Sequence, residues 1–512
     1  MSLSDQSPTF LFLFNPQRYP LYLGKGFFLF ESNDAVRFRR CFRLKSQIST
    51  SVSKVVSSSQ YRFSTTSISF YIMLLNLPFK RIVRFQVNGG LLLIIAALAA
   101  LILANSPFSS FYHSLWEHPV SFQVGDFNLF NHNGHPLTLI QFINDALMAV
   151  FFFAVGLEIK REILVGELSS IKKAMLPIVA ACGGMILPVL IYFFVTKGTP
   201  AENGLAIPMA TDIAFALGIL SLFGKRVPLS LKIFLTAFAV VDDIGGVLVI
   251  ALFYSSHFDV TYILWSLGLF AFLIFCNLAQ NKSRWLYALG GVVMWYLFMQ
   301  SGIHATIAGV ITAFVVPAKP LACIGSYIHC IHESIHSIPD TGNRNMILNQ
   351  EQIEALHNIK SSTDDAISPL QFLEEFLHRP VNYLIMPVFA FANAGVVLTN
   401  ANGDIEVGTL TWAVAFSLLV GKFIGVYLFT WMAIRLKWAG FGLGMNWKNL
   451  CGICLLGGIG FTVSLFIANL SFGTDEVLLN QAKMGVLLGT LMSGLLGALV
   501  LHFTLPQQAQ EI

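Results

Sequence analysis

The sequence predicts an all-α polytopic membrane protein with about twelve transmembrane helices. Three observations predict it: the composition, the spacing of the apolar segments and the distribution of positive charge. The chain has 512 residues, of which 55% are hydrophobic and 11% are charged. A soluble globular protein has about 25% charged residues, so this chain has too few to cover a surface in water. Its net charge of +4 is too small to indicate nucleic acid as a partner.

Twelve apolar segments are candidates for membrane spans, because a helix needs about 20 mostly apolar residues to cross a bilayer. These segments begin near Val87, Leu137, Lys173, Gly204, Ser230, Thr261, Arg284, Ala305, Val381, Gly408, Asn449 and Ala482. The segment 305–316 is the shortest and falls below a full span.

The loops between these segments alternate between basic and nearly uncharged. Lys80, Arg81 and Arg84 precede the first span, whereas the loop 105–136 has no Lys or Arg. The alternation continues along the chain. Cytoplasmic loops carry the excess of Lys and Arg, so both termini are predicted to be cytoplasmic.

A short segment at 120–130 does not fit the membrane pattern. Val120, Phe122 and Val124 alternate with polar residues, and a Gly-Asp pair follows that suits a two-residue turn. We expect a small external β-hairpin, which is too short to span and would serve packing or a homodimer contact.

Two further segments also depart from the pattern. Residues 1–72 are rich in Ser, Phe and Arg, which suits a transit-like extension and equally suits translated upstream sequence, since Met73 is a plausible start. The membrane domain would then be 73–512. Within it, 321–371 is polar and His-rich and is predicted to be a long cytoplasmic loop.

Ionisable residues inside the apolar segments are few. Each costs ~2.5–3.5 kcal/mol on insertion scales, so each is a candidate functional residue. They are Asp145, Glu158, Asp212, Asp242, Asp243 and Lys422. The first two lie toward the ends of one span, where an interfacial role explains them as well as function does.

Asp242 and Asp243 are adjacent on one predicted helix, so their side chains point about 100° apart. One can face a cavity while the other takes a partner on a neighbouring helix. Lys422 is the only cation identified at mid-span, and charge neutrality nominates it as that partner.

Two predicted spans are interrupted. Pro208 removes a backbone donor four residues before Asp212, and glycines at 457, 458 and 460 interrupt a second apolar segment. Interrupted spans at matching places in two halves indicate inverted-topology repeats, with the broken helices crossing in mid-membrane. The two repeats would be 173–254 and 408–501.

The sequence His332-Glu333-Ser334-Ile335-His336 has the HExxH pattern of zinc proteases, which leaves a membrane metalloprotease as an alternative function. Zinc binding without catalysis would use His329, Cys330 and His332. An intramembrane aspartyl protease using Asp212 with Asp243 and a passive channel are further alternatives. Titratable carboxylates with a lysine counter-ion favour coupled ion exchange over these.

Eight motifs in this order resemble the NhaA family of sodium/proton antiporters over about 87–501. The motifs are INDALMA from Ile143, VGLEIKRE from Val155, IPMATDIAFALG from Ile207, VDD from Val241, SGIHATIAG from Ser301, FAFANAG from Phe389, GK at Gly421 and GIGFT from Gly458. That family is itself a standard example of inverted repeats with broken helices, so these two indications are not independent.

The resemblance implies a role for each matching residue. Asp243 would be the principal site for Na⁺ and protons, Asp242 would alternate between Na⁺ and a salt bridge with Lys422, and Thr211 could offer an oxygen to Na⁺. Asp212 and Lys422 would compensate the charge of helix ends at the crossing. The cluster that matches the family's pH-response residues is Glu158, Arg161, Glu162, Glu374 and His378. The family's Arg-Leu-Glu-His run is here Phe-Leu-Glu-Glu at 372–375, without its Arg and its His.

The function implied is electrogenic, pH-regulated extrusion of Na⁺ in exchange for external protons across a bacterial inner membrane, by a transporter rather than an enzyme. No cofactor is expected. Burial favours a protonated carboxylate and a nearby cation favours a charged one, so one site can exchange Na⁺ for protons by competition. Carboxylate and hydroxyl oxygens suit small hard cations, so Li⁺ should also be carried.

Overall fold

The computed structural model describes residues 18–22, 27–31, 89–121, 123–124, 127–128, 130–132, 135–254, 258–281, 283–319, 324–336, 350–398 and 407–506. The chain divides into two units, 1–86 and 87–512. In the first, strand β1 (Arg18–Tyr22) pairs antiparallel with β2 (Phe27–Glu31). The rest of 1–72 lies outside the described residues.

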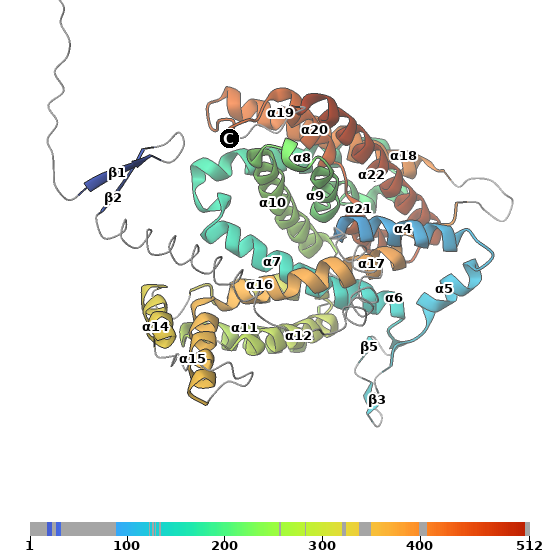
Figure 1. Ribbon diagram of the computed structural model, residues 1–512. Coiled ribbons are helices and arrows are strands. Elements are labelled where there is room, and N and C mark those ends of the chain that lie inside the picture. Colours follow the sequence, from blue (N-terminus) through green and yellow to red (C-terminus); the bar gives the residue numbers. More distant parts are fainter. Residues whose placement is uncertain are drawn as a thin grey trace, which may run out of the picture. The chain divides into compact units, whose positions relative to one another are not determined.

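The second unit is predominantly helical, as the sequence predicts (Figure 1). Its helices are α4 (Gly89–Ala104), α5 (Ser109–Glu117), α6 (Leu139–Phe142), η1 (Ile143–Leu147), α7 (Met148–Leu164), η2 (Glu167–Ser169), α8 (Ile171–Thr196), η3 (Pro200–Gly204), η4 (Ile207–Met209), α9 (Ile213–Leu222), η5 (Gly224–Arg226), α10 (Leu229–Phe253), α11 (Val260–Leu278), α12 (Arg284–Ser301), α13 (Ala305–Val315), α14 (Ile324–His336), α15 (Gln350–Ala366), α16 (Pro369–Pro380), η6 (Val381–Ile385), α17 (Met386–Asn393), α18 (Thr409–Phe416), η7 (Ser417–Gly421), α19 (Lys422–Arg435), α20 (Trp447–Leu456), α21 (Phe461–Phe472) and α22 (Glu476–Thr504).

Six helices in the described part of the chain are long and apolar enough to cross a membrane, or nine if each of three bent pairs is one span. The predicted spans at Arg284, Ala305 and Val381 correspond to α12, α13 and η6–α17 and do not meet this criterion. At 11 residues, α13 is below the length of a full span. The number twelve therefore stays a prediction, while a multi-pass membrane protein is well supported.

Short strands lie between α5 and α6. Strand β3 (Gln123–Val124) pairs with β4 (Phe127–Asn128), and β5 (Asn131–His132) pairs with β6 (His135–Pro136). The predicted Gly-Asp turn falls between β3 and β4, outside the described residues. The second strand pair was not predicted from the sequence.

The segment 321–371 differs from the predicted loop, because it contains α14 and α15, which pack against each other. Isoleucines at 324, 328, 331 and 335 recur at helical spacing along α14. This repeat favours a helix, although Ile328 and Ile335 are 61% and 54% exposed, so it does not form a buried face. The polar, histidine-rich composition of the segment obscured the repeat in the sequence.

Both predicted interruptions are present in the helices. The segments Pro200–Met209 and Ile213–Ser221 meet at 45°, and Trp447–Leu456 and Phe461–Phe472 meet at 41°. The two breaks lie side by side: the Asp212 amide donates to the Ile459 carbonyl over 2.6 Å, and the Ser464 hydroxyl donates to the Ile207 carbonyl over 2.7 Å. Each break thus supplies partners for backbone that water cannot reach.

Helices α8 and α19 pack closely where Gly183 faces Gly425. A Cβ on Gly183 would overlap the Gly425 carbonyl oxygen, and a Cβ on Gly425 would overlap the Gly183 carbonyl oxygen. Small residues of this kind let helix backbones approach in membranes. The contact holds α19, and with it Lys422, against α8.

We predict that Gly183→Ala lowers the thermal unfolding midpoint of the purified protein in detergent. Its methyl group must push the two backbones apart, and overpacking of this kind costs about 1–3 kcal/mol. The matched control is Gly268→Ala on α11, where a Cβ meets nothing within 4 Å. Equal midpoints for the two variants would contradict the close contact.

Candidate ion-binding site

The centre of α10 carries two buried carboxylates, Asp242 and Asp243, with 1% and 4% of their surface exposed. The Lys422 ammonium lies 2.5 Å from Asp242 Oδ2, and both side chains are fully buried. This is the partner that charge neutrality predicted. An uncompensated charge at this depth would be costly, and in this pair each group compensates the charge of the other.

Lys422 also connects the pair to both helix breaks. Its ammonium donates to Thr211 Oγ1 over 3.0 Å, and the Thr211 hydroxyl donates to the Gly457 carbonyl over 2.8 Å. Gly457 is the C-cap of α20. The positive charge thus lies one hydroxyl away from the C-terminal end of a helix, whose dipole is negative.

Asp212 lies at the N-terminal ends of two helices. It is the N-cap of α9, where its Oδ1 accepts from the Phe215 amide over 2.9 Å. Its Oδ2 accepts from the Thr462 amide over 3.2 Å and from the Thr462 hydroxyl over 2.7 Å, in the first turn of α21. A carboxylate in this position satisfies amides that have no partner in either helix and stabilises both positive dipole ends.

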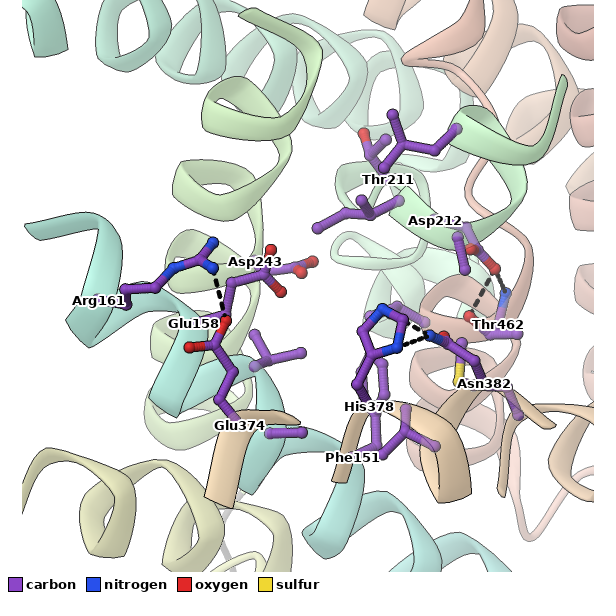
Figure 2. Close-up of a pocket in the computed structure, with 18 residues that line it drawn as sticks. Phe151, Glu158, Arg161, Thr211, Asp212, Asp243, Glu374, His378, Asn382 and Thr462 are labelled. Carbon is purple, nitrogen blue, oxygen red and sulfur yellow. Dashed lines mark hydrogen bonds and ion pairs between the residues drawn. The ribbon is translucent and has the colours of Figure 1, made fainter. Parts of the chain in front are cut away.

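Asp243 faces a cavity of about 290 Å³, which the side chains of Thr211, Asp212 and Thr462 also line (Figure 2). Asp242 does not line it, so the two adjacent carboxylates point into different surroundings, as their spacing predicts. Asp243 Oδ1 is buried and has no hydrogen-bond partner in the described part of the protein. Asp243 thus brings a titratable carboxylate with an unpaired oxygen to the wall of this cavity.

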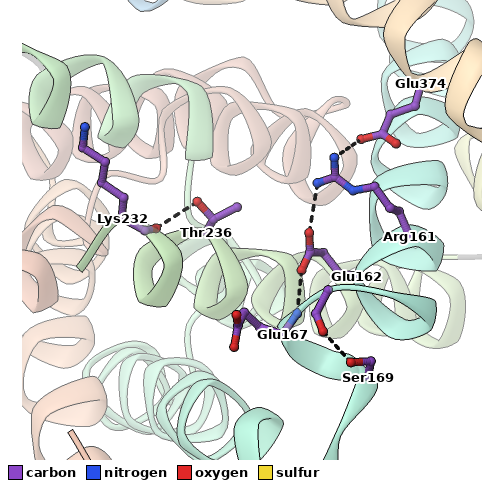
Figure 3. Close-up of polar contacts among 8 residues, drawn as sticks. Arg161, Glu162, Glu167, Ser169, Lys232, Thr236 and Glu374 are labelled. Atoms are coloured by element: carbon purple, nitrogen blue, oxygen red, sulfur yellow. Dashed lines mark hydrogen bonds and ion pairs between the residues drawn. The ribbon is translucent and has the colours of Figure 1, made fainter. Parts of the chain in front are cut away.

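Four of the five predicted pH-response residues line the same cavity. Glu158, Arg161, Glu374 and His378 line it, and Glu162 does not. Arg161 Nη1 is 2.9 Å from Glu374 Oε1, and its Nη2 is 2.9 Å from Glu162 Oε1, so the guanidinium bridges two helices (Figure 3). Glu374, which is remote in sequence from the breaks, thus shares a cavity with Asp243.

Glu374 is largely buried, with 19% of its side-chain surface exposed. Burial raises the pKa of its carboxyl, and the Arg161 guanidinium opposes that effect. A carboxyl balanced in this way is suited to respond to pH. His378 lies on the same helix one turn later, where its ring is 3.2 Å from the Asn382 amide nitrogen.

The structure adds buried polar groups that the sequence did not single out. Lys483 on α22 is 8% exposed, so Lys422 is not the only buried cation. The last span was predicted to begin near Ala482, which placed this lysine at its edge, but α22 begins at Glu476.

A chain of asparagine side chains also joins three helices. Asn469 Nδ2 donates to Asn393 over 2.7 Å, and Asn393 Nδ2 donates to Asn144 over 2.8 Å.

The HExxH pattern lies on α14 rather than in a loop. His329 Nδ1 is 3.6 Å from Glu333 Oε1, and both side chains are largely exposed. Among the described residues, three or more metal-binding side chains do not gather anywhere in the fold. The side chain of His336 lies outside the described residues.

Interrupted helices that meet beside buried carboxylates and a buried lysine define a class of protein: an ion-coupled membrane transporter. The model of the family described as "Na+/H+ antiporter 1" matches residues 80–501, and the chain belongs to this family. The family is one of transporters rather than enzymes, and nothing supports the metalloprotease alternative.

Curated relatives cover most of the chain. A protein of Phocaeicola vulgatus named Na(+)/H(+) antiporter NhaA is 63% identical over 441 residues, which are 86% of this chain and 99% of that protein. Proteins of the same name from Bacteroides fragilis (strain YCH46) and Helicobacter pylori (strain P12) are 58% and 43% identical, over 83% and 85% of this chain and 97% of each relative.

We predict that Asp242→Asn and Lys422→Met each lower the thermal unfolding midpoint, and that the double variant recovers much of the loss. Removing one partner of a buried pair leaves an uncompensated charge and costs about 3–5 kcal/mol, whereas replacing both can be neutral. Thermal unfolding in detergent checks this at one pH for all four proteins. Additive losses in the double variant would show that the two groups do not stabilise each other.

Proposed function

We propose that this chain exchanges Na⁺ for protons, with Asp243 as the principal site for both ions. The observation that carries the proposal is the unpaired Asp243 carboxylate, which lines a cavity directly beside the Asp242–Lys422 pair. Membership of an Na⁺/H⁺ antiporter family supports it. A carboxylate that can hold either a proton or a cation suits exchange by competition.

Na⁺ would bind between Asp243 and Asp242, with Thr211 as a further oxygen ligand. At present Asp242 and Thr211 Oγ1 both accept from Lys422. When Na⁺ arrives, Lys422 would release Asp242, and one acceptor position of the Thr211 hydroxyl would become free for the ion. Na⁺ and the lysine thus compete for the same two oxygens, and Li⁺, another small hard cation, would be carried as well.

Coupling follows because one carboxylate pair cannot hold Na⁺ and its protons together. The empty site carries negative charge, and we expect the transporter in this state to switch poorly between facing the cytoplasm and facing the outside. Only the forms that have bound Na⁺ or protons then switch between the two sides. Family membership favours more protons than sodium ions in each cycle. The exchange is then electrogenic, and a membrane potential, worth about 2.3 kcal/mol per charge per 100 mV, helps to extrude Na⁺.

Asp212 and Lys422 would compensate the helix ends that the breaks expose. The hydrogen bonds from the first turns of α9 and α21 to Asp212 support this role, and the Lys422–Thr211–Gly457 chain supports the opposite role for Lys422. The broken helices can then move during transport while the partial charges of their ends stay compensated inside the membrane.

Glu158, Arg161, Glu162, Glu374 and His378 would set the pH at which exchange begins. Four of them line the cavity that Asp243 also lines, and Arg161 is bonded to the fifth, Glu162. The alternation of basic loops favours twelve spans of a bacterial inner membrane, with both termini cytoplasmic. The paired strands near 120–130 would form an external hairpin and join two protomers.

We predict that Asp243→Asn abolishes exchange while the protein still inserts in the membrane, because an amide keeps the shape but neither titrates nor carries charge. Na⁺-induced proton flux in everted vesicles, with membrane protein level measured in parallel, checks this. The control is Glu117→Gln, an exposed carboxylate on α5. Normal Na⁺-induced proton flux in the Asp243 variant would refute the assignment.

We predict that Glu374→Gln moves the onset of exchange to higher pH, by roughly one to two units, without abolishing it. Glutamine imitates the protonated carboxyl, which is the form favoured at low pH. Other groups of the cluster must then lose their protons before exchange begins, which requires a higher pH. Exchange rate against pH at saturating Na⁺ measures the shift. Glu375→Gln, an exposed neighbour outside the cavity, should leave the profile unchanged, and an unchanged profile for Glu374→Gln would exclude a role in pH response.

A further inference from the structure

A second cavity, of about 660 Å³, lies where α7, α11 and α13 end and α16 begins. Its polar lining includes Arg161, Asn277, Gln280, Lys319 and Gln371. The volume is in the range of small-molecule sites. Arg161 also lines the cavity that Asp243 faces, and it is the one described residue common to the two linings.

The two cavities have opposite chemistry. Glu158, Asp212, Asp243 and Glu374 give the first cavity four carboxyl groups. The described lining of the second has two cations and several amides, and none of its side chains is a carboxylate. Lys319 is exposed and forms no ion pair with any described residue. The carbonyl oxygen of Gln371 accepts from Ser368, which leaves its NH₂ group as a donor.

Helix ends give this cavity partial charges of both signs, because the negative C-terminal ends of α7 and α11 border it at Val165 and Leu278. The C-terminal end of α13 is negative, but Lys160 Nζ donates to the Phe314 and Val316 carbonyls, and Asn277 Nδ2 donates to the Val315 carbonyl over 2.7 Å. The N-terminal end of α16, which is positive, borders the cavity at Ser368. The donors that remain suit an oxyanion with several acceptor oxygens.

We propose that the second cavity binds a phosphate-bearing anion through Lys319 and Arg161, and that the bound anion acts on the first cavity by competing for Arg161. The second half of this proposal rests on the exchange function proposed above. A guanidinium has five donors and binds phosphate in a bidentate manner, so the anion would compete directly with Glu162 and Glu374.

The expected direction of the effect follows from the surroundings of Glu374. Arg161, Glu162 and Glu158 face it from α7, His378 lies on its own helix, and Asp243 lines the same cavity from α10. Arg161 is the cation bonded to it, at 2.9 Å. When the anion weakens that bond, Glu374 keeps its proton to higher pH, and the onset of exchange moves to higher pH.

Two sources could supply the phosphate: a free anion or the headgroup of an anionic lipid. Basic pockets between membrane helices are typical headgroup sites. The full chain in a neutral detergent would be unfolded thermally with inorganic phosphate, with short-chain phosphatidylglycerol or with phosphatidylcholine of equal chain length. We expect phosphatidylglycerol, phosphate or both to raise the unfolding midpoint, and phosphatidylcholine to leave it unchanged.

Lys319→Gln should weaken this binding by roughly tenfold or more, since it removes one charge-assisted hydrogen bond. Lys225→Gln, an exposed lysine outside both cavities, is the matched control and should bind like the parent. Equal stabilisation of the parent and of Lys319→Gln, or no stabilisation of the parent by either probe, would overturn the proposal.

Exchange in vesicles of phosphatidylcholine, with and without phosphatidylglycerol or added phosphate, tests the action on the first cavity. The anion should move the onset to higher pH in the parent and in Lys225→Gln, and less in Lys319→Gln. Surface potential acts equally on all three proteins and does not explain a difference between them. Binding that depends on Lys319 with no exchange in any protein would refute the proposed function alone, and identical shifts in all three would refute the coupling through Arg161.

Discussion

The buried ion pair between Lys422 and Asp242 is the interaction on which the positions of three elements depend. Because water does not reach either side chain, each charge needs the other as its partner. Lys422 begins α19, Asp242 lies on α10, and Thr211 lies in the extended segment between the halves of a broken helix. Because the ammonium contacts both oxygens, it fixes α10 and α19 against the break. Three residues after Lys422, the Gly183–Gly425 contact holds the same helix against α8. The unpaired state of Asp243 follows, since its neighbour already has the available cation.

Arg161 separates two regions of opposite charge. Toward the broken helices the cavity walls carry carboxyl groups, and toward the ends of α7, α11 and α13 they carry donors. One guanidinium that contacts Glu162 and Glu374 therefore has an effect on both regions. Its side chain is 41% exposed, so solvent and solutes can reach it while its bonded carboxylates are much less exposed.

The sequence alone was enough to predict the two helix breaks and the different directions of Asp242 and Asp243. Pro208 and the glycines at 457, 458 and 460 predicted the two breaks, although prolines 177 and 188 lie inside the unbroken helix α8. The divergence of Asp242 and Asp243 follows from helix geometry. The shared cavity could not be predicted, because Glu374 reaches it only through the packing of α16 against α7. Lys483 was missed because the start of α22 depends on its Asp475 cap rather than on hydropathy.

In the part of the chain that the structure describes, three π-helical turns, η1, η6 and η7, occur inside otherwise α-helical spans. Turn η7 directly precedes Lys422. A π-turn accommodates one more residue than an α-turn, and each residue turns a helix by about 100°. Loss of a single residue from η7 would rotate Lys422 away from Asp242, or shift α18 on α22 by the same angle. A substitution in this turn leaves the direction of Lys422 unchanged, but a deletion changes it. Helices α14 and α15 pack against each other, so a change of length between them leaves Lys422 in place, whereas a change of length in η7 does not.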